Sequence, residues 1–196
     1  MDKNFLEDIL KKLKKKGIDE ADVLLTQSEN KSTSCRLGKI EKTEESEIKE
    51  IGIRVILKKR QSIISSTNIE PQNIKNLIEN VIEMVKVVPK DKFCGLAEKK
   101  VITNFNVNDA KSLDLHDSYE PTTQELNKKV ISLEESALSN KKITNSEGAE
   151  LAYSKSKFIM MGSNGLYSEI TKTHSDYIIA VLAGKKGNME RAYDYK

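Results

Sequence analysis

Side chains that could ligate a metal or attack a substrate are few and far apart in this sequence. The chain has two histidines, His116 and His174, and two cysteines, Cys35 and Cys94. A catalytic zinc site takes three protein ligands, often two of them one helical turn apart, and neither histidine has such a partner. We therefore expect the histidines at or near the surface, Cys35 in the core and Cys94 in a loop. A Cys–His pair formed only in three dimensions stays an open alternative.

The remaining polar residues do not form a phosphate-binding or nucleophile motif. The GSNG run at 162–165 lacks the lysine and the strand–loop–helix setting of a P-loop, and it predicts a β-turn instead. The carboxylate pairs Glu44–Glu45 and Glu134–Glu135 are expected on the solvated surface. Residue chemistry alone thus predicts neither a catalytic residue nor a metal ligand.

Composition narrows the class of protein. The 196 residues include 33 Lys and Arg against 30 Asp and Glu, a net charge of +3. Nucleic-acid binders concentrate basic residues on one face, whereas acidic residues are interleaved with the lysines here, so a nucleic-acid partner is not expected. No apolar run approaches the roughly 20 residues that span a bilayer, so no membrane association is expected. Residues 1–20 lack the apolar core of a secretory signal, so we expect a cytoplasmic protein with free thiols.

Apolar periodicity predicts the secondary structure. Helices are expected over 2–16, from Pro71 to a point before Pro89, and over 122–139, because apolar residues recur there at helical spacing. The segment 90–120 has no clear period and is expected to be a connection. Turn signals are found at 30–32, 58–62 and 163–165. Strands are expected over 21–28, 32–42, 48–57, 62–67, 149–154, 157–162, 166–173, 176–184 and 189–195.

These elements predict an α+β fold in which helices pack on mostly antiparallel sheets. A helix followed by a β-meander forms the first half, and the later half resembles a second helix-plus-meander unit. Gly38 and Gly52 interrupt expected strands, which implies a close backbone approach or a bulge at each. Arg54 lies within an apolar strand and needs a buried or interfacial acceptor, because a lone buried guanidinium is costly.

Five segments, in order along nearly the whole chain, resemble the PmbA/TldD family. They are the stretches 35–67 and 87–102, the LDLHD run at 113–117, the NSEG run at 145–148, and SNGL at 163–166 followed by GNMERAYDY. The Pro-x-Asp-x-Phe-x-Gly-Leu run at 89–96 is similar to the PmbA branch, also called TldE. The family-signature positions, expected to be structural or interface residues, are Arg36, Gly38, Gly52, Arg54, Asn145, Ser146, Glu147, Gly148, Asn164, Gly165 and Arg191.

The resemblance implies a division of the chain and a missing part. Residues 1–112 would form the family's N-terminal α+β domain, and residues 113–196 the truncated start of its central region. The family's chains are much longer, and the zinc ligands of the TldD branch lie in an HExxxH motif and further residues of the C-terminal half. No catalytic residue and no metal ligand is therefore carried over to this chain. Zinc is expected only in the C-terminal region of a TldD-type partner.

The resemblance also implies a function. The chain would be the N-terminal, non-catalytic part of a PmbA/TldE-like subunit in a cytoplasmic zinc metalloprotease complex, in a family also named modulator of DNA gyrase. It would pair with a TldD-like subunit or with itself, and shape a chamber that admits unfolded peptide for proteolysis. The alternative is a stand-alone protein without a protease role, which binds peptide through an exposed sheet edge or associates with gyrase and DNA. A nonfunctional fragment with an exposed edge is a third possibility.

Overall fold

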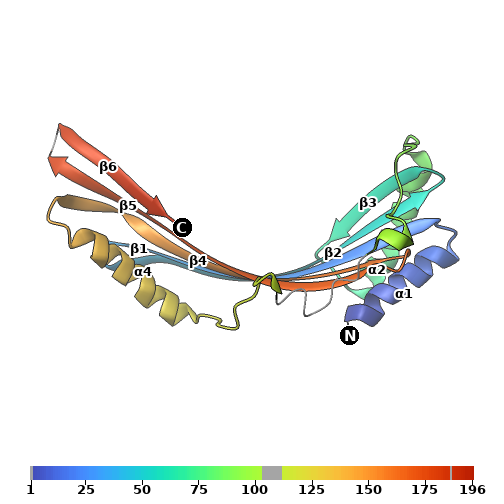
Figure 1. Cartoon of the computed structure of the whole chain (residues 1–196), viewed down its shortest axis with the longest axis horizontal. Helices are drawn as coiled ribbons and strands as arrows, with labels where there is room; N and C mark the ends of the chain where they lie inside the picture. The colour runs from blue at the N-terminus through green and yellow to red at the C-terminus, as the bar shows by residue number, and fades with distance from the viewer. Residues whose placement is uncertain (1, 103–111, 186) are drawn as a thin grey trace. The chain divides into compact units, whose positions relative to one another are not determined.

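The computed structural model describes residues 2–102, 112–185 and 187–196, and in each half of the chain a helix precedes three strands (Figure 1). The predicted helices are present as α1 (Asp2–Lys15), α2 (Pro71–Val87) and α4 (Thr123–Leu138), and a short 3-10 helix covers Lys99–Val101. The strands are β1 (Glu20–Arg36), β2 (Lys39–Leu57), β3 (Arg60–Ser66), β4 (Ile143–Gly162), β5 (Tyr167–Lys185) and β6 (Asn188–Tyr195).

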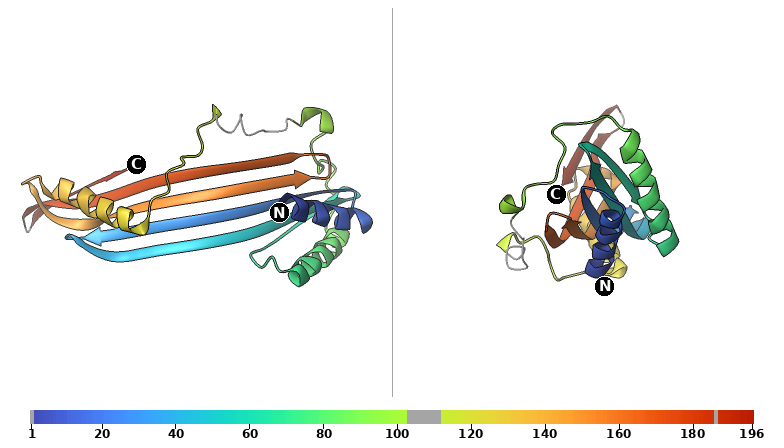
Figure 2. Two further views of the ribbon diagram at one scale, coloured as in Figure 1. Left: turned by 90° about the horizontal axis from the view of Figure 1, so that it is seen from below. Right: turned by 90° about the vertical axis from the view of Figure 1, so that its right-hand side faces the viewer.

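The six strands form one sheet in the order β3-β2-β1-β4-β5-β6. Strand β3 pairs antiparallel with β2, and β6 pairs antiparallel with β5. Figure 2 shows the long strands running side by side. The predicted α+β class is confirmed, and the strands of the two expected meanders join one sheet instead of forming separate ones.

Strand β1 is longer than the sequence predicted. The turn expected at 30–32 is wrong, because these residues lie within β1, which continues to Arg36. Their turn-favouring side chains are overridden by the sheet, in which β1 has a neighbouring strand on each side. The breaks expected near 155 and 174 are absent for the same reason, since β4 and β5 continue through them.

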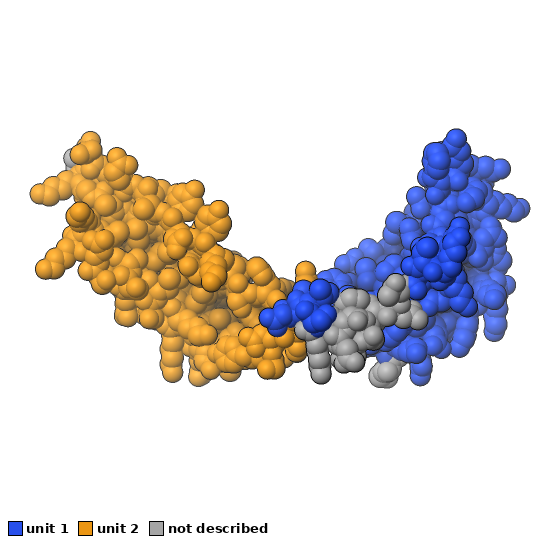
Figure 3. Space-filling view, in the orientation of Figure 1, with its two compact units in different colours: residues 1–27, 48–115, 156–171 blue, residues 28–47, 116–155, 172–196 orange. Residues whose placement is uncertain are grey.

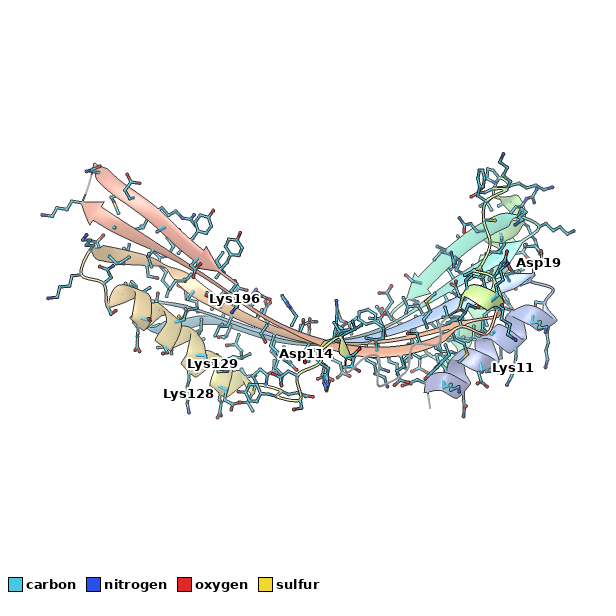
Figure 4. All side chains as sticks on the ribbon, in the orientation of Figure 1. Lys11, Asp19, Asp114, Lys128, Lys129 and Lys196 are labelled. Atoms are coloured by element: carbon cyan, nitrogen blue, oxygen red, sulfur yellow. The ribbon has the colours of Figure 1, made fainter. Side chains whose placement is uncertain are left out.

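Two tight turns connect β1 to β2 and β2 to β3. Leu37 and Gly38 have φ values of 50° and 73°, and Lys58 and Lys59 have 49° and 63°. Positive φ at both central residues is typical of the type I′ turn, whose twist matches that of the flanking strands. Asp19, labelled in Figure 4 between α1 and β1, accepts a hydrogen bond from Lys58 N at 2.7 Å. The second turn is therefore tied to the start of β1.

The close backbone approach or bulge expected at Gly38 and Gly52 is present at neither position. Gly38 lies in the turn and not inside a strand, and its positive φ explains the glycine. An added Cβ would meet nothing within 4 Å at Gly38 or at Gly52. Gly52 pairs with Ser65 in a continuous β2–β3 register, so there is no bulge there. The turn predicted at 163–165 is confirmed, since Gly162 N donates to Leu166 O at 2.9 Å and Gly165 has a φ of +95°.

The chain divides into two compact units, coloured separately in Figure 3. Unit 1 comprises residues 1–27, 48–115 and 156–171, and unit 2 comprises residues 28–47, 116–155 and 172–196. These units do not follow the predicted boundary between residues 112 and 113, because β1, β2, β4 and β5 each contribute residues to both. The predicted family-domain division itself stays a prediction.

Unit 1 has a core between its helices and one face of the sheet. Alternate residues of β1, such as Val23 and Leu25, face this core, because successive side chains of a strand point to opposite sides. The stripe predicted for α2 is buried as expected. The buried members of this core are Leu6, Ile9, Leu13, Ile18, Ala21, Val23, Leu25, Ile51, Ile53, Val55, Ile74, Leu77, Ile78, Val81, Ile82, Val85, Ile159 and Met161.

Unit 2 has a smaller core beneath α4. Val130 of α4 packs there with Cys35 of β1, Ala149 of β4, and Ile179 and Val181 of β5. The helix begins at a capping box, in which the Thr122 side chain accepts from Glu125 N and the Glu125 carboxylate accepts from Thr122 N.

The segment expected to be a connection, residues 90–120, is only partly described. It contains the short helix Lys99–Val101, turns and irregular chain, while residues 103–111 lie outside the described residues. Among the described helices, none combines the length and apolar character needed to cross a membrane.

The β1–β2 turn gives a first test of the fold. Replacing Leu37 by Asn creates the Asn-Gly pair that type I′ turns favour, and it removes an exposed leucine from a left-handed conformation. We expect Leu37→Asn to raise the free energy of unfolding by about 1 kcal/mol in urea denaturation. The matched control is Ile40→Asn, the same chemical change at an exposed strand position, which should not stabilise. A loss of stability in Leu37→Asn would contradict the turn assignment.

Candidate functional site

An ion pair lies on the face of unit 1 that points away from its core. Asp22 of β1 and Arg54 of β2 alternate with core residues, so both project from this face, which we call the open face. Arg54 Nε lies 3.2 Å from Asp22 Oδ1 and 3.0 Å from Oδ2, and Nη2 also bonds to Oδ2. The predicted acceptor for Arg54 is therefore Asp22, and its hydrogen bonds raise the pKa of the Arg54 guanidinium.

A pocket of about 350 Å³ opens over this ion pair. Its polar wall contains Asp22 and Arg54, whose side chains are 10% and 32% exposed. Its apolar walls come from the segment after α2 and from the β4–β5 hairpin, and consist of Leu96, Val101, Ile102, Met160 and Leu166. A concave apolar pocket with a few polar groups is the usual form of a ligand site.

Backbone and side-chain hydrogen bonds hold the segment after α2 against the rest of unit 1. Leu96 N donates to the Glu20 carboxylate at 3.2 Å, and the Lys59 ammonium donates to the Cys94 carbonyl at 3.0 Å. The Asn164 amide donates to the Ala97 carbonyl at 2.9 Å. The predicted turn at 163–165 thereby positions one rim of the pocket, and two signature residues, Arg54 and Asn164, lie at the same site.

A carboxylate from α4 is buried in unit 2. Glu134 is 0% exposed. Its Oε1 accepts from Leu37 N at 2.9 Å, and its Oε2 accepts from Gly38 N at 2.8 Å. The Ser146 hydroxyl also hydrogen bonds to the carboxylate, and the Cys35 thiol lies 3.6 Å from Oε2. One side chain thus joins the β1–β2 turn to α4 and β4.

The electrostatics of this cluster favour the charged form of Glu134. Burial acts to raise the pKa of Glu134, but hydrogen bonds from Ser146, Gly38 and Leu37 outweigh it, and the pKa lies below the ordinary 4.5. Burial, and then the Glu134 charge, raise the pKa of Cys35 to about 11. The thiol is therefore protonated at neutral pH and donates to Val130 O at 3.3 Å, which makes it a structural group and not a nucleophile.

The NSEG run lies beside this carboxylate. Residues 145–148 belong to strand β4, in which Gly148 has a φ of +115°. A Cβ on Gly148 would lie 2.9 Å from the Cys35 carbonyl oxygen, so only glycine fits. Gly148 N donates to the Ser146 hydroxyl at 2.9 Å, and Arg36 Nε donates to the Ser146 carbonyl at 3.2 Å.

The remaining signature residues of unit 2 lie nearer the surface. The Asn145 side chain accepts from Ser146 N at 2.9 Å. Arg191 of β6 forms an ion pair with Glu147, but both side chains are more than one-third exposed, so this pair adds little stability. The signature positions therefore form two groups, with Gly52, Arg54, Asn164 and Gly165 in unit 1 and the others in unit 2.

Glu134 is the residue that sequence reasoning misplaced. It was expected on the surface beside Glu135, and only Glu135 is exposed. The available signal was its spacing, since Glu134 follows Leu126 by eight residues and Val130 by four, along the buried stripe of α4. A charged residue in an apolar stripe requires partners, and the turn N–H groups are the partners.

The residues first considered for metal chemistry are not brought together. Cys35 and Cys94 are free and buried, while His116 and His174 are exposed. In the part of the chain that the structure describes, no three His, Cys, Asp or Glu side chains are grouped to hold a metal ion. A zinc site is therefore not assigned to these residues.

Comparisons with known proteins agree with the sequence resemblance. Residues 21–85 match the family model described as PmbA/TldA metallopeptidase domain 1. The chain is similar to PmbA/TldD proteins over most of its length. It is 28% identical over 178 residues to the metalloprotease PmbA of Escherichia coli O157:H7, and the match covers 90% of this chain and 39% of that protein.

Solved structures share the fold. A Bacteroides thetaiotaomicron protein named as a modulator of DNA gyrase superposes with a TM-score of 0.86 at 20% identity, over 98% of this chain and 44% of that one. TldE from Thermococcus kodakarensis gives a TM-score of 0.78 at 18% identity, over 98% and 42% of the two chains. The chain thus spans about two-fifths of the length of the PmbA/TldD relatives it matches.

The buried carboxylate predicts a large effect of a small substitution. Glu134→Gln keeps the size of the side chain but places an amide NH₂ against backbone donors. We expect it to lower the free energy of unfolding by about 3 kcal/mol in urea denaturation. Glu135→Gln, the same change at the exposed neighbour, should alter stability by less than about 0.5 kcal/mol. Equal effects of the two substitutions would show that Glu134 does not hold the turn.

The pH dependence of stability gives an independent test. The pKa of Glu134 is lowered in the folded protein, so its contribution is fully present above the ordinary value of 4.5 and is lost as the pH falls through the folded-state pKa. The stability difference between the native chain and Glu134→Gln should therefore shrink below pH 4.5. Urea titrations of both proteins between pH 7 and pH 3 measure it, and a difference that grows in acid would contradict the assignment.

Proposed function

We propose that this chain is the N-terminal, non-catalytic part of a PmbA/TldE-like subunit of a cytoplasmic zinc metalloprotease complex. The observation that carries the proposal is the match of residues 21–85 to a metallopeptidase domain 1. The chain pairs with a TldD-like subunit and shapes a chamber that admits unfolded peptide. Zinc is held by the C-terminal region of the TldD-type partner.

The exposed end of unit 2 supports the pairing role. Strand β6 is the last strand in the sheet order, and all of its residues are exposed. Tyr193 and Tyr195 are stacked with ring centroids 6.2 Å apart and are 60% and 69% exposed. Ile178, directly opposite Tyr195 in β5, is 46% exposed. Exposed aromatic and aliphatic side chains along a sheet edge are typical of a protein–protein contact.

A pairing experiment tests the proposal. The tagged chain is mixed with the purified TldD-type chain from the same genome, and binding is measured by light scattering and titration calorimetry. We expect a complex, and the double variant Tyr193→Glu/Tyr195→Glu should weaken it by roughly tenfold or more, because charges would be buried without partners. Tyr119→Glu, at an exposed tyrosine outside β6, is the control. Absence of a complex with the unaltered chain would overturn the pairing role.

The open edge also favours a second candidate, a stand-alone protein that adds a peptide strand to β6. Peptide cleavage assays separate the two readings. The non-catalytic proposal expects no chelator-sensitive cleavage by this chain with added zinc, and cleavage only with the TldD-type partner. Robust zinc-dependent cleavage by the chain alone would refute it, and peptide binding without any partner complex would favour the second candidate.

A further inference from the structure

The pocket on the open face of unit 1 combines an apolar lining with one closed ion pair. The Asp22 carboxylate and the Arg54 guanidinium neutralise each other at its polar wall. A ligand with a net charge would compete with one member of the pair and leave the other uncompensated, which is costly in a partly buried site. The pocket therefore suits a neutral group.

The ion pair still offers hydrogen bonds to such a group. Its contacts use Nε and Nη2 of Arg54, so Nη1 lies outside them. A carboxylate has about four lone-pair directions, and a guanidinium has five N–H donors. The Arg54 guanidinium is thus a donor beside an acceptor, the Asp22 carboxylate. The C=O and N–H groups of a peptide backbone are the complementary acceptor and donor.

Apolar surface continues beyond the pocket on the same face. Ile63 of β3 is directly opposite Arg54 in the β2–β3 register, so the two side chains lie on one face, and Ile63 is 61% exposed. Val101 at the rim is 63% exposed, and Phe93 in the same segment is 84% exposed. A single small molecule in the pocket would leave these side chains in water, whereas an extended chain would cover several of them.

We propose that the open-face pocket of unit 1 binds an uncharged, apolar side chain of an extended peptide, with the adjoining peptide amide facing the Asp22–Arg54 pair and Ile63 contacting a neighbouring side chain. This inference rests on the proposed peptide-handling role. It adds the place where the peptide binds and the kind of side chain that is preferred there. Peptides with an apolar residue between small polar residues are bound, and those with an acidic or basic residue at that position are rejected.

The preference is tested with two capped, fluorescein-labelled heptapeptides. Both have the sequence Ser-Gly-Thr-X-Thr-Gly-Ser, with Leu or Glu as X. Fluorescence anisotropy with the 196-residue chain should show roughly tenfold or tighter binding of the Leu peptide. Equal affinity of the two peptides, or no binding of the Leu peptide at millimolar protein, would overturn the inference.

The position is tested with matched valine variants. Val101 at the pocket rim and Val87 at the end of α2 are both exposed, and only Val101 lines the pocket. We expect Val101→Glu to weaken binding of the Leu peptide by roughly tenfold, because it places an unpaired charge against an apolar side chain, and Val87→Glu to leave it unchanged. A second pair, Met160→Glu in the pocket and Met84→Glu on α2, repeats the comparison. Unchanged binding in both pocket variants would overturn the inference.

Partner binding distinguishes this inference from the wider proposal. Val101→Glu should still form the complex with the TldD-type chain, since β6 belongs to unit 2. If Val101→Glu and Met160→Glu both bind the peptide and the partner normally, the pocket assignment is wrong and the pairing role stands. If the unaltered chain binds the Leu peptide selectively but forms no complex, the pocket assignment stands and the pairing role is wrong.

Discussion

The buried Glu134 carboxylate fixes the register of the strands in unit 2. It binds the N–H groups of both central residues of the β1–β2 turn from a helix that follows almost a hundred residues later. Side chains alternate along a strand, so a slip by one residue would exchange every core-facing position for an outward one. Cys35 would then leave the core, and Arg36 could no longer donate to the Ser146 carbonyl. The signature residues Arg36, Gly38 and Ser146 are thus positioned around this turn and its carboxylate.

In both tight turns, a carboxylate from elsewhere in the chain stabilises residues that have an unfavourable positive φ. Type I′ turns need positive φ at two residues, yet three of the four central residues are Leu37, Lys58 and Lys59, which disfavour it. Each turn has a carboxylate acceptor from elsewhere in the chain, Glu134 for the first and Asp19 for the second. A charged acceptor strengthens a backbone hydrogen bond, and it offsets part of the conformational cost.

Sequence reasoning found the elements whose signals are local. The apolar stripe of α2 and the SNG turn depend on residues a few positions apart, and both are confirmed. The β1–β2 turn has no Asn-Gly pair, and its carboxylate comes from α4, so nearby residues do not predict the turn. The spacing of Glu134 along α4 indicates its burial, but its partners in the turn do not follow from nearby residues. Arg54 was predicted only in part. The sequence indicated that Arg54 needs an acceptor, but the acceptor is Asp22 because β1 lies beside β2 in the sheet. What the sequence leaves open is long-range pairing.

The Asp22–Arg54 pair is better explained by binding than by stability. A partly buried ion pair loses much of its attraction to desolvation, and two apolar residues of similar size would hold neighbouring strands at least as well. The rest of the pocket lining that the structure describes is mostly apolar and includes no other charged residue. Packing within the pocket therefore does not require the ion pair. An apolar replacement would, however, remove the donor and acceptor that orient a peptide amide. The ion pair therefore determines how a bound peptide backbone is oriented on the open face, while the apolar walls provide the contact area.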